Sequence, residues 1–238
     1  MELIVKNLSK SYDKKEVVKN INFEMSSGET LGILGPNGAG KTTLFYIIAG
    51  LIDCENGDIY LGETRINATN ISQRTSLGLS YLPQESSIFK GLTVEENILS
   101  ALEQRKDIQK KDLQEELEAL LEDFNLQTFS KTMGVKLSGG ERRRTEIARS
   151  LATNPKFILL DEPFAGIDPI AVSDLKETIN NLNKKNIGVL ISDHNVRDTM
   201  NICQKILVVN QGEVIAHGKP SDVTKDPLVK KVYLGDNF

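Results

Sequence analysis

A glycine-rich loop between two apolar stretches constrains the fold of this 238-residue chain more than any other feature of its sequence. Residues 30–34 form a short apolar run, residues 35–40 carry glycines at 35, 38 and 40, and residues 44–49 are apolar again. Glycine lets the backbone turn tightly, so successive N–H groups can point inward and form an anion nest at a helix N-terminus. The order predicts a buried strand, an anion-binding loop and a buried helix that ends at Gly50.

The loop and the residues after it fit the P-loop pattern G-x-x-x-x-G-K-[ST], which binds nucleotide phosphates. The matching residues are Gly35, Pro36, Asn37, Gly38, Ala39, Gly40, Lys41 and Thr42. In this pattern Lys41 places a cation on the β- and γ-phosphates, and the Thr42 hydroxyl ligates Mg²⁺. We expect the adjacent Thr43 to lie at the nucleotide as well.

A second stretch supplies the acidic groups that a nucleotide-hydrolysing site needs. Residues 157–160 are continuously apolar, as in a strand buried on both faces of a parallel sheet, and Asp161 and Glu162 follow directly. Asp161 is expected to hold Mg²⁺ through water, as the acidic residue at this position does in P-loop enzymes. Glu162 lies one residue further on and points elsewhere, so we interpret it as the general base that polarises the attacking water.

The alternation of strands and helices is interrupted by a purely helical stretch. Thr93 and Ser138 each begin a capping box, which predicts a helix after each of them. We therefore predict an α/β fold, the mixed sheet of a P-loop NTPase (RecA-like), with an α-helical insert subdomain and an N-terminal antiparallel β portion. Residues 1–238 are expected to form one nucleotide-binding domain, with the RecA-like core at about 1–87 and 154–238 and the helical subdomain at about 88–153. Asn56 and Gly57 are expected to form a hairpin turn.

Charge and cysteine content narrow the function classes. The formal net charge of −4 argues against a dedicated nucleic-acid binder, which usually carries a basic excess. Cys54 and Cys203 are too few for a disulfide framework, and the N-terminus has no basic region followed by a long apolar stretch. The apolar run 44–49 is far shorter than the roughly 20 residues of a transmembrane helix. We therefore expect a cytoplasmic chain that neither inserts into a membrane nor binds nucleic acid.

Further motifs, taken in chain order, give a family resemblance that covers essentially the whole sequence. Residues 137–141, Leu-Ser-Gly-Gly-Glu, match the signature loop of ABC transporter ATPases and lie shortly before the apolar stretch that ends at Asp161. The other matches are Tyr12 at the A-loop position, Gln84 in the Q-loop, Asp168 in the D-loop and His194 as the switch histidine. Several motifs in the family's order are far more specific than any one of them, so the chain resembles an ABC transporter ATPase.

The resemblance implies how these residues act on ATP. In the family, Tyr12 would stack on adenine, Gln84 would contribute to nucleotide and Mg²⁺ binding, and His194 would sense the γ-phosphate. The signature residues Ser138, Gly139, Gly140 and Glu141 would meet the ATP held by the other subunit. Ser138 is the expected cap of a helix whose free N–H groups can bind phosphate. A head-to-tail homodimer with two ATP molecules at its interface is therefore implied.

Three stretches resemble one branch of the family, the ATPases of lipopolysaccharide-transport exporters. They are residues 160–170, 192–197 and 232–238. The ATPases of branched-chain amino-acid importers are the alternative. They also tend to end in Tyr-Leu-Gly, but they typically carry Glu-His-Asp where this chain has Asp193, His194 and Asn195. The exporter resemblance implies a motor on the cytoplasmic face of the inner membrane that drives lipopolysaccharide toward the outer membrane.

The resemblance also implies partners. In the family, a coupling helix from each of two membrane subunits docks in a groove between the α/β lobe and the helical insert. Ile88, Phe89 and Leu92 are apolar residues in a loop flanked by polar ones, so we expect them to line that groove.

Two alternative functions belong to other classes of protein. One is a soluble ABC protein acting on DNA or ribosomes, which usually carries long coiled coils or two cassettes. The other is a nucleotide-gated binding module. The presence of Glu162 and His194 argues against the second of these.

Overall fold

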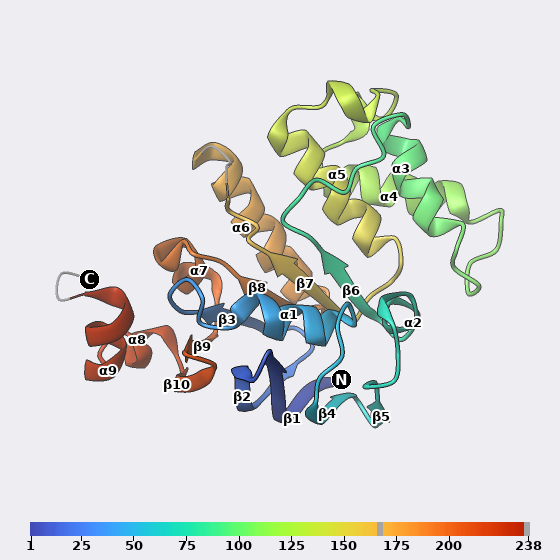
Figure 1. The fold of residues 1–238 in the computed structure, drawn as a ribbon. Helices are drawn as coiled ribbons and strands as arrows, with labels where there is room; N and C mark the ends of the chain where they lie inside the picture. The colour runs from blue at the N-terminus through green and yellow to red at the C-terminus, as the bar shows by residue number, and fades with distance from the viewer. Residues whose placement is uncertain (166–168, 236–238) are drawn as a thin grey trace.

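A six-stranded sheet forms the frame of the fold (Figure 1). The computed structural model describes residues 1–165 and 169–235, and it describes the side chains of all of these except 169–171. The strands are β3 (Thr30–Leu34), β6 (Leu79–Leu82), β7 (Phe157–Asp161), β8 (Gly188–Ser192), β9 (Lys205–Asn210) and β10 (Glu213–Gly218). Their order across the sheet is β10-β9-β3-β8-β7-β6, and all neighbours are parallel except the antiparallel pair of β10 and β9.

Continuous apolar runs explain why the middle of this sheet is buried. β3, β7 and β8 are buried at every residue, as expected for parallel strands covered on both faces. Helix α1 (Lys41–Ala49) covers one face, and α6 (Pro169–Lys184) and α7 (Val196–Ile202) pack on the other. The predicted buried strand at 30–34 and the buried helix that ends at Gly50 are confirmed.

A second, antiparallel sheet is built from the N-terminal part of the chain. Its strands are β1 (Glu2–Tyr12), β2 (Lys15–Ser26), β4 (Asn56–Leu61) and β5 (Thr64–Arg65), in the order β2-β1-β4-β5. The alternation at Ile21, Phe23 and Met25 places these three side chains in the core, where α1 separates the two sheets. The predicted α/β fold with an N-terminal antiparallel portion is therefore confirmed.

The predicted hairpin turn at Asn56 and Gly57 is wrong, because both residues lie in β4. Gly57 has a φ of +93°, and a Cβ there would lie 2.5 Å from the carbonyl oxygen of Asn7 in β1. The glycine thus permits a close approach of two strands at an irregular point of their pairing. The turn lies further on, between Leu61 and Thr64, which pair across β4 and β5.

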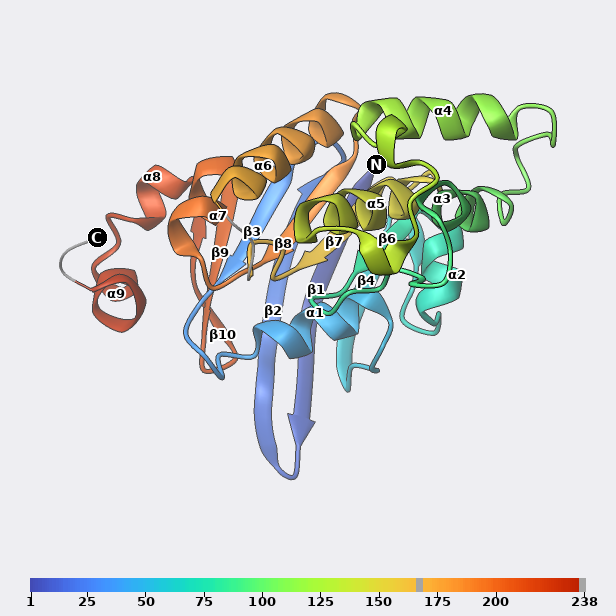
Figure 2. The ribbon, with the colours of Figure 1, turned by 90° about the horizontal axis from the view of Figure 1, so that it is seen from above.

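Helices dominate the stretch between β6 and β7, as the sequence predicts. They are α3 (Val94–Leu102), α4 (Leu113–Asp123) and α5 (Gly139–Leu151), with the 3-10 turns η1 (Gln127–Phe129) and η2 (Gly134–Lys136). Both predicted capping boxes are present, at Thr93 before α3 and at Ser138 before α5. Figures 1 and 2 show α3, α4 and α5 grouped on one side of the molecule. The boundary of the helical subdomain at about 88–153 stays a prediction.

The C-terminal part lies at the opposite end from this helical group (Figure 2). It consists of α8 (Pro220–Val223), α9 (Pro227–Val229) and the π-helical turn η3 (Lys230–Leu234). Val223 and Val229 anchor it in the hydrophobic core. Within residues 1–165 and 169–235, no helix is both long enough and apolar enough to cross a bilayer.

Arg74, in α2 (Ile71–Ser76), fixes the end of α1 that points away from the glycine-rich loop. Its guanidinium is buried and donates to the carbonyl oxygens of Ile47 and Ile48 at 2.5 and 2.7 Å, and to that of Ile66 at 3.0 Å. Carbonyl groups in the last turn of a helix lack donors within the helix, and a cation there is favourable. Arg74 therefore holds α1 in place beneath the loop that precedes it.

Candidate active site

Four strand ends meet at one edge of the six-stranded sheet. β3, β6, β7 and β8 run parallel, so the residues that follow them emerge on the same side. These residues are the loop 35–40 after β3, Gln84 after β6, Glu162 after β7 and His194 after β8. The topology of the sheet thus brings four separately predicted motifs into one site.

Close backbone contacts that only glycine allows shape the loop 35–40. Gly35 has a φ of +151°, and a Cβ there would lie 2.0 Å from the carbonyl oxygen of Val209 in β9. Gly40 has a φ of +102°, and a Cβ there would lie 2.2 Å from the carbonyl oxygen of Val17 in β2. Packing against both sheets fixes the loop in a curved form, which a phosphate nest requires.

Lys41 lies over the loop that precedes it. Its Nζ donates to the carbonyl oxygens of Gly35 and Pro36, at 2.6 and 3.0 Å. Burial lowers the pKa of the Lys41 ammonium, and the charges of Glu162 and Asp193 oppose that shift. Among the described residues, no side chain caps the N-terminus of α1, so its N–H groups are available to an anion.

Asp161 lies at the end of β7, almost fully buried. The Tyr81 hydroxyl donates a hydrogen bond to its Oδ2 at 3.2 Å. Burial raises the pKa of Asp161 to about 6; the charge of Glu162 adds to the rise, and the Tyr81 hydrogen bond opposes it. A cation beside this carboxylate would favour the ionised form.

Glu162 combines a strained backbone with contacts to two other loops. Its φ of +43° is costly for a non-glycine residue, and such conformations gather at functional sites. Its N–H donates to the carbonyl oxygen of Ser192 in β8 at 2.6 Å. Its Oε2 accepts a hydrogen bond from Gln84 Nε2 at 2.9 Å and lies 3.3 Å from His194 Nδ1. The Glu162 carboxylate therefore contacts both the predicted Q-loop glutamine and the predicted switch histidine.

Asp193 ties two loops of the site together, and the sequence analysis did not assign it to the site. Its buried carboxylate accepts hydrogen bonds from the N–H of Phe164 at 2.9 Å and from the N–H of Asn195 at 2.7 Å. Burial raises the pKa of Asp193, and these two hydrogen bonds oppose the rise. Since Phe164 follows Glu162 and Asn195 follows His194, Asp193 fixes the two loops relative to each other. Its position between an apolar strand and the switch histidine is the sequence signal that could have identified it.

The donor groups at this edge suit a Mg²⁺ ion that binds together with a nucleotide. Within the described ranges, no group of three or more His, Cys, Asp and Glu side chains could hold a metal ion. Asp161 and the exposed residues Thr42 and Gln84 each have a side-chain oxygen that could act as a ligand. Mg²⁺ usually keeps several waters and binds through one or two carboxylates and substrate phosphates. The residues present therefore fit an ion that needs phosphate oxygens to complete its coordination.

The predicted signature residues are not joined to this site within one chain. In the described part of the structure, no hydrogen bond or ion pair connects residues 138–141 with the loop 35–40. Ser138 and Gly139 are exposed at the start of α5, where the Ser138 N–H donates to Glu141 Oε2 at 2.8 Å. Tyr12 is exposed at the end of β1, and the predicted D-loop residue Asp168 lies outside the described residues.

The predicted docking residues are divided between core and surface. Ile88 is only 7% exposed and belongs to the hydrophobic core, so its prediction as a groove residue is wrong. The Ile88 N–H donates a hydrogen bond to the buried Glu146 carboxylate, so this part of the loop faces the core. Phe89 is 51% exposed, with the Arg149 guanidinium 4.6 Å from its ring centroid, and Leu92 is half-buried.

Val135 extends the exposed apolar surface beside Phe89, and the sequence analysis missed it. It is 62% exposed, and its N–H donates to the carbonyl oxygen of Lys90 at 3.2 Å. The neighbouring Gly134 N–H donates to the carbonyl oxygen of Leu92 at 2.8 Å. These bonds place η2 beside the loop 88–92, although the two segments are distant in sequence.

The fold and the site together define a class of protein, a P-loop cassette that hydrolyses a nucleotide. The sequence profile of the ABC transporter family matches residues 18–165. A second profile, the branched-chain amino acid ATP-binding cassette transporter, matches residues 213–238. The chain belongs to the ABC transporter family and is an ABC-type ATPase, as the sequence analysis predicted.

Individual relatives place the chain more narrowly. The lipopolysaccharide export system ATP-binding protein LptB of Haemophilus influenzae is 49% identical over 99% of this chain and 98% of its own length. The crystal structure of MJ1267, an ATP-binding cassette of an ABC transporter, in its ADP conformation has a TM-score of 0.87 and 29% identity, covering 99% of this chain and 100% of that one. The dimeric bacterial cassette MJ0796 has a TM-score of 0.79 and 26% identity, covering 92% of this chain and 98% of that one.

Proposed function

We propose that this chain is the ATP-hydrolysing subunit of an ABC exporter that moves lipopolysaccharide from the inner membrane toward the outer membrane. One observation carries the catalytic part of the proposal: Gln84 and His194 meet on the carboxylate of Glu162 beside a P-loop. The transport part is supported by the similarity to LptB of Haemophilus influenzae over nearly the full length of both chains.

ATP is bound by the loop 35–40 and by the N-terminus of α1. Backbone N–H groups of the loop and helix donate to the phosphate oxygens, and Thr42 and Thr43 lie at the start of the same helix. The Lys41 ammonium exchanges its two carbonyl partners for the β- and γ-phosphates, which are better acceptors because they are charged. Tyr12 stacks on the adenine.

Glu162 acts as the general base. Its carboxylate takes a proton from the water that attacks the γ-phosphate, while Gln84 and His194 hold the carboxylate in position. Lys41 and His194 balance the negative charge on the transferring phosphoryl group. Asp193 keeps the loops of Glu162 and His194 together, so the base and the histidine face the same phosphate.

Asp161, Thr42 and Gln84 would hold Mg²⁺. When bound, the ion neutralises charge on the β- and γ-phosphates. The hydroxyl of Tyr81 orients the Asp161 carboxylate through its hydrogen bond to Oδ2. This hydrogen bond fixes the orientation of the Asp161 carboxylate at the edge of the sheet.

A second copy of the chain completes each ATP site. The exposed helix start at Ser138 and Gly139 can bind an anion from outside the chain, and the dimeric cassette MJ0796 has the same fold. In a head-to-tail dimer, residues 138–141 of one copy meet the γ-phosphate held by the other, with Asp168 near the shared interface. Two identical contacts related by a two-fold axis form a closed assembly.

Two membrane-spanning subunits complete the transporter, and this chain lies beneath them on the cytoplasmic face of the inner membrane. Their coupling helices dock where Phe89 and Val135 expose apolar surface beside Leu92, between the core and the proposed helical subdomain at about 88–153. An exposed aromatic ring next to an aliphatic side chain suits an apolar anchor on a partner helix.

A second candidate function is an importer of branched-chain amino acids. The match of residues 213–238 to the profile of that group of transporters favours it. The match covers only the C-terminal part, whereas the similarity to LptB of Haemophilus influenzae covers 99% of the chain. The site that hydrolyses ATP is the same in both cases, so the partner subunits distinguish the two functions.

Purification of the tagged chain from detergent-solubilised membranes tests the proposal. We expect two different membrane subunits of a lipopolysaccharide exporter to be retained. Each should be present at one copy for every two ATPase chains. The Phe89→Ala variant, which removes the exposed ring, should retain less of them. Recovery of amino-acid permease subunits instead would support the second candidate, and the absence of any membrane subunit would contradict both.

A further inference from the structure

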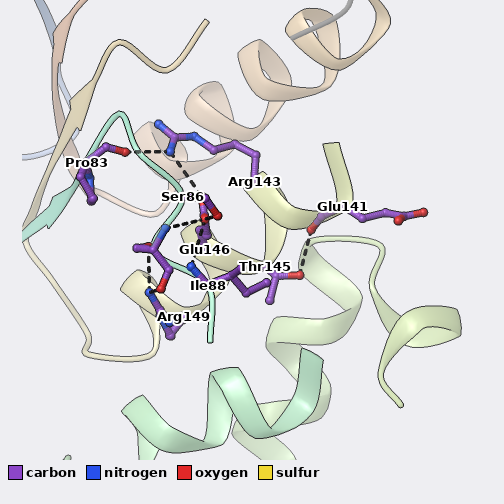
Figure 3. Close-up of polar contacts among 9 residues, drawn as sticks. Pro83, Ser86, Ile88, Glu141, Arg143, Thr145, Glu146 and Arg149 are labelled. Atoms are coloured by element: carbon purple, nitrogen blue, oxygen red, sulfur yellow. Dashed lines mark hydrogen bonds and ion pairs between the residues drawn. The ribbon is translucent and has the colours of Figure 1, made fainter. Parts of the chain in front are cut away.

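A buried glutamate on α5 holds the segment that follows Gln84 (Figure 3). Glu146 is only 2% exposed, and its Oε1 accepts three hydrogen bonds. They come from Ser86 Oγ at 2.7 Å, from the Ser87 N–H at 2.9 Å and from the Ile88 N–H at 3.2 Å. Hydrogen bonds to a buried carboxylate are strong and directional, so Glu146 fixes this part of the loop firmly on α5.

Two arginines on the same side of α5 extend the attachment. Arg143 Nη1 donates to the carbonyl oxygen of Pro83 at 3.1 Å and lies 3.4 Å from Glu146 Oε2. Arg149 Nη2 donates to the carbonyl oxygen and to Oγ of Ser87, both at 2.8 Å. Residues 143, 146 and 149 are three positions apart, so they share one face of the helix. That face holds the segment 83–88 along its length.

The attached segment connects parts of the molecule that have different tasks. Gln84, near its start, donates to Glu162 in the active site. Phe89, directly after its end, is exposed at the proposed docking surface. Helix α5 itself begins at Gly139, and the first signature residue, Ser138, is its N-cap. The hydrogen bonds of Glu146 therefore connect the signature helix α5 with a segment that reaches the catalytic base at one end and the docking surface at the other.

A separate attachment holds the far end of the same loop. The N–H groups of Gly134 and Val135 donate to the carbonyl oxygens of Leu92 and Lys90. These backbone bonds fix residues 90–92, whereas Glu146 binds residues 86–88, which are nearer to Gln84. Changing Glu146 alone removes its bonds to residues 86–88, while the contacts of Arg143 and Arg149 and the backbone bonds at 90–92 remain.

We propose that Glu146 is a positioning residue that makes the segment 84–89 and helix α5 move as one body. When ATP held by a second copy binds residues 138–141, α5 moves, and Gln84 and Phe89 move with it. This inference rests on the proposed function, because it requires the ATP of a second copy to engage the signature residues. Glu146 suits the task because one oxygen satisfies two backbone N–H groups that would otherwise be left without a partner.

Hydrogen–deuterium exchange of the full chain, with and without saturating ATP and Mg²⁺, tests the proposal. Glu162→Gln serves as the background, because it prevents turnover during labelling. The test variants are Glu146→Ala, which removes the acceptor, and Glu146→Gln, which keeps one acceptor oxygen in nearly the same shape. Ile147→Val is the matched control, since this neighbouring buried side chain belongs to the hydrophobic core.

In the background chain and in the control, ATP should slow exchange both at 138–142 and at 86–89. In Glu146→Ala the response at 138–142 should remain, while the response at 86–89 falls by about tenfold, as expected for a local opening that loses several hydrogen bonds. Glu146→Gln should restore part of it. A merely structural role would weaken both responses together.

An unchanged response at 86–89 in both Glu146 variants overturns the inference alone. Loss of both responses in these variants, with the control intact, also overturns it, because the residue would then only stabilise α5. A background chain without any response at 138–142 contradicts the proposed dimer, and the inference falls with it. The two failures are therefore distinguishable.

Discussion

Replacing Glu162 by glutamine tests the catalytic assignment with very little change in shape. The new amide oxygen can still accept the 2.9 Å hydrogen bond from Gln84, so the loop after β7 keeps this attachment. The change removes the negative carboxylate that lies 3.3 Å from His194 Nδ1, and with it the group that accepts the proton from water. A positioned general base contributes about 10²–10⁴-fold to a rate. We therefore expect kcat to fall at least 10²-fold, which corresponds to about 3 kcal/mol of lost transition-state stabilisation.

Binding of ATP should persist in this variant. Burial lowers the pKa of the Lys41 ammonium, the charge of Glu162 opposes that shift, and the same negative charge repels a bound phosphate. Phosphate release measures turnover, and size-exclusion chromatography with ATP measures the closed dimer, which should accumulate. Glu213→Gln is the control, because it removes an exposed carboxylate that pairs with Lys19. A Glu162→Gln chain whose kcat stays within threefold of the parent refutes the assignment of the base.

Three further predictions follow from other parts of the structure. Lys41→Ala should weaken ATP binding at least tenfold in calorimetry, because the cation that Lys41 places on the phosphates is lost; unchanged affinity would contradict the P-loop assignment. Arg74→Met should lower the free energy of unfolding by about 3 kcal/mol in urea titrations, because buried carbonyl groups of α1 lose a charged donor; a loss below about 1 kcal/mol would show that other groups satisfy them. Phe89→Ala should reduce recovery of the membrane subunits without changing the ATP affinity of the isolated chain, and a parallel loss of both would contradict a docking role.

The elements around the active site could be predicted because their sequence signals are local. The apolar run at 30–34 and the glycines after it mark a strand and a loop that are consecutive in the chain. The capping box at Ser138 marks the start of α5 within four residues. Gln84, Glu162 and His194 each follow a strand of a parallel sheet, so the shared direction of the strands brings them to one edge. Because β6 lies beside β7, Gln84 can make its 2.9 Å contact with Glu162.

Contacts between distant segments could not be predicted from local patterns. The charged stretch 142–144 indicates a solvated helix face, but Arg143 turns inward to the carbonyl oxygen of Pro83. Glu146 is buried because backbone N–H groups 58 and 59 residues earlier bind it, and no periodicity along α5 reveals them. The same bonds draw Ile88 into the core, which its apolar character alone did not distinguish from exposure at a docking surface.

ATP-driven release of lipopolysaccharide from proteoliposomes tests most directly whether this chain powers an exporter. The chain is reconstituted with its co-purified membrane subunits in vesicles that contain lipopolysaccharide, and release to an acceptor outside is followed after ATP and Mg²⁺ are added. We predict release with the parent chain and none with Glu162→Gln, which still binds ATP. Hydrolysis of ATP by the parent complex without release, or release that persists in Glu162→Gln, would contradict export powered by this site.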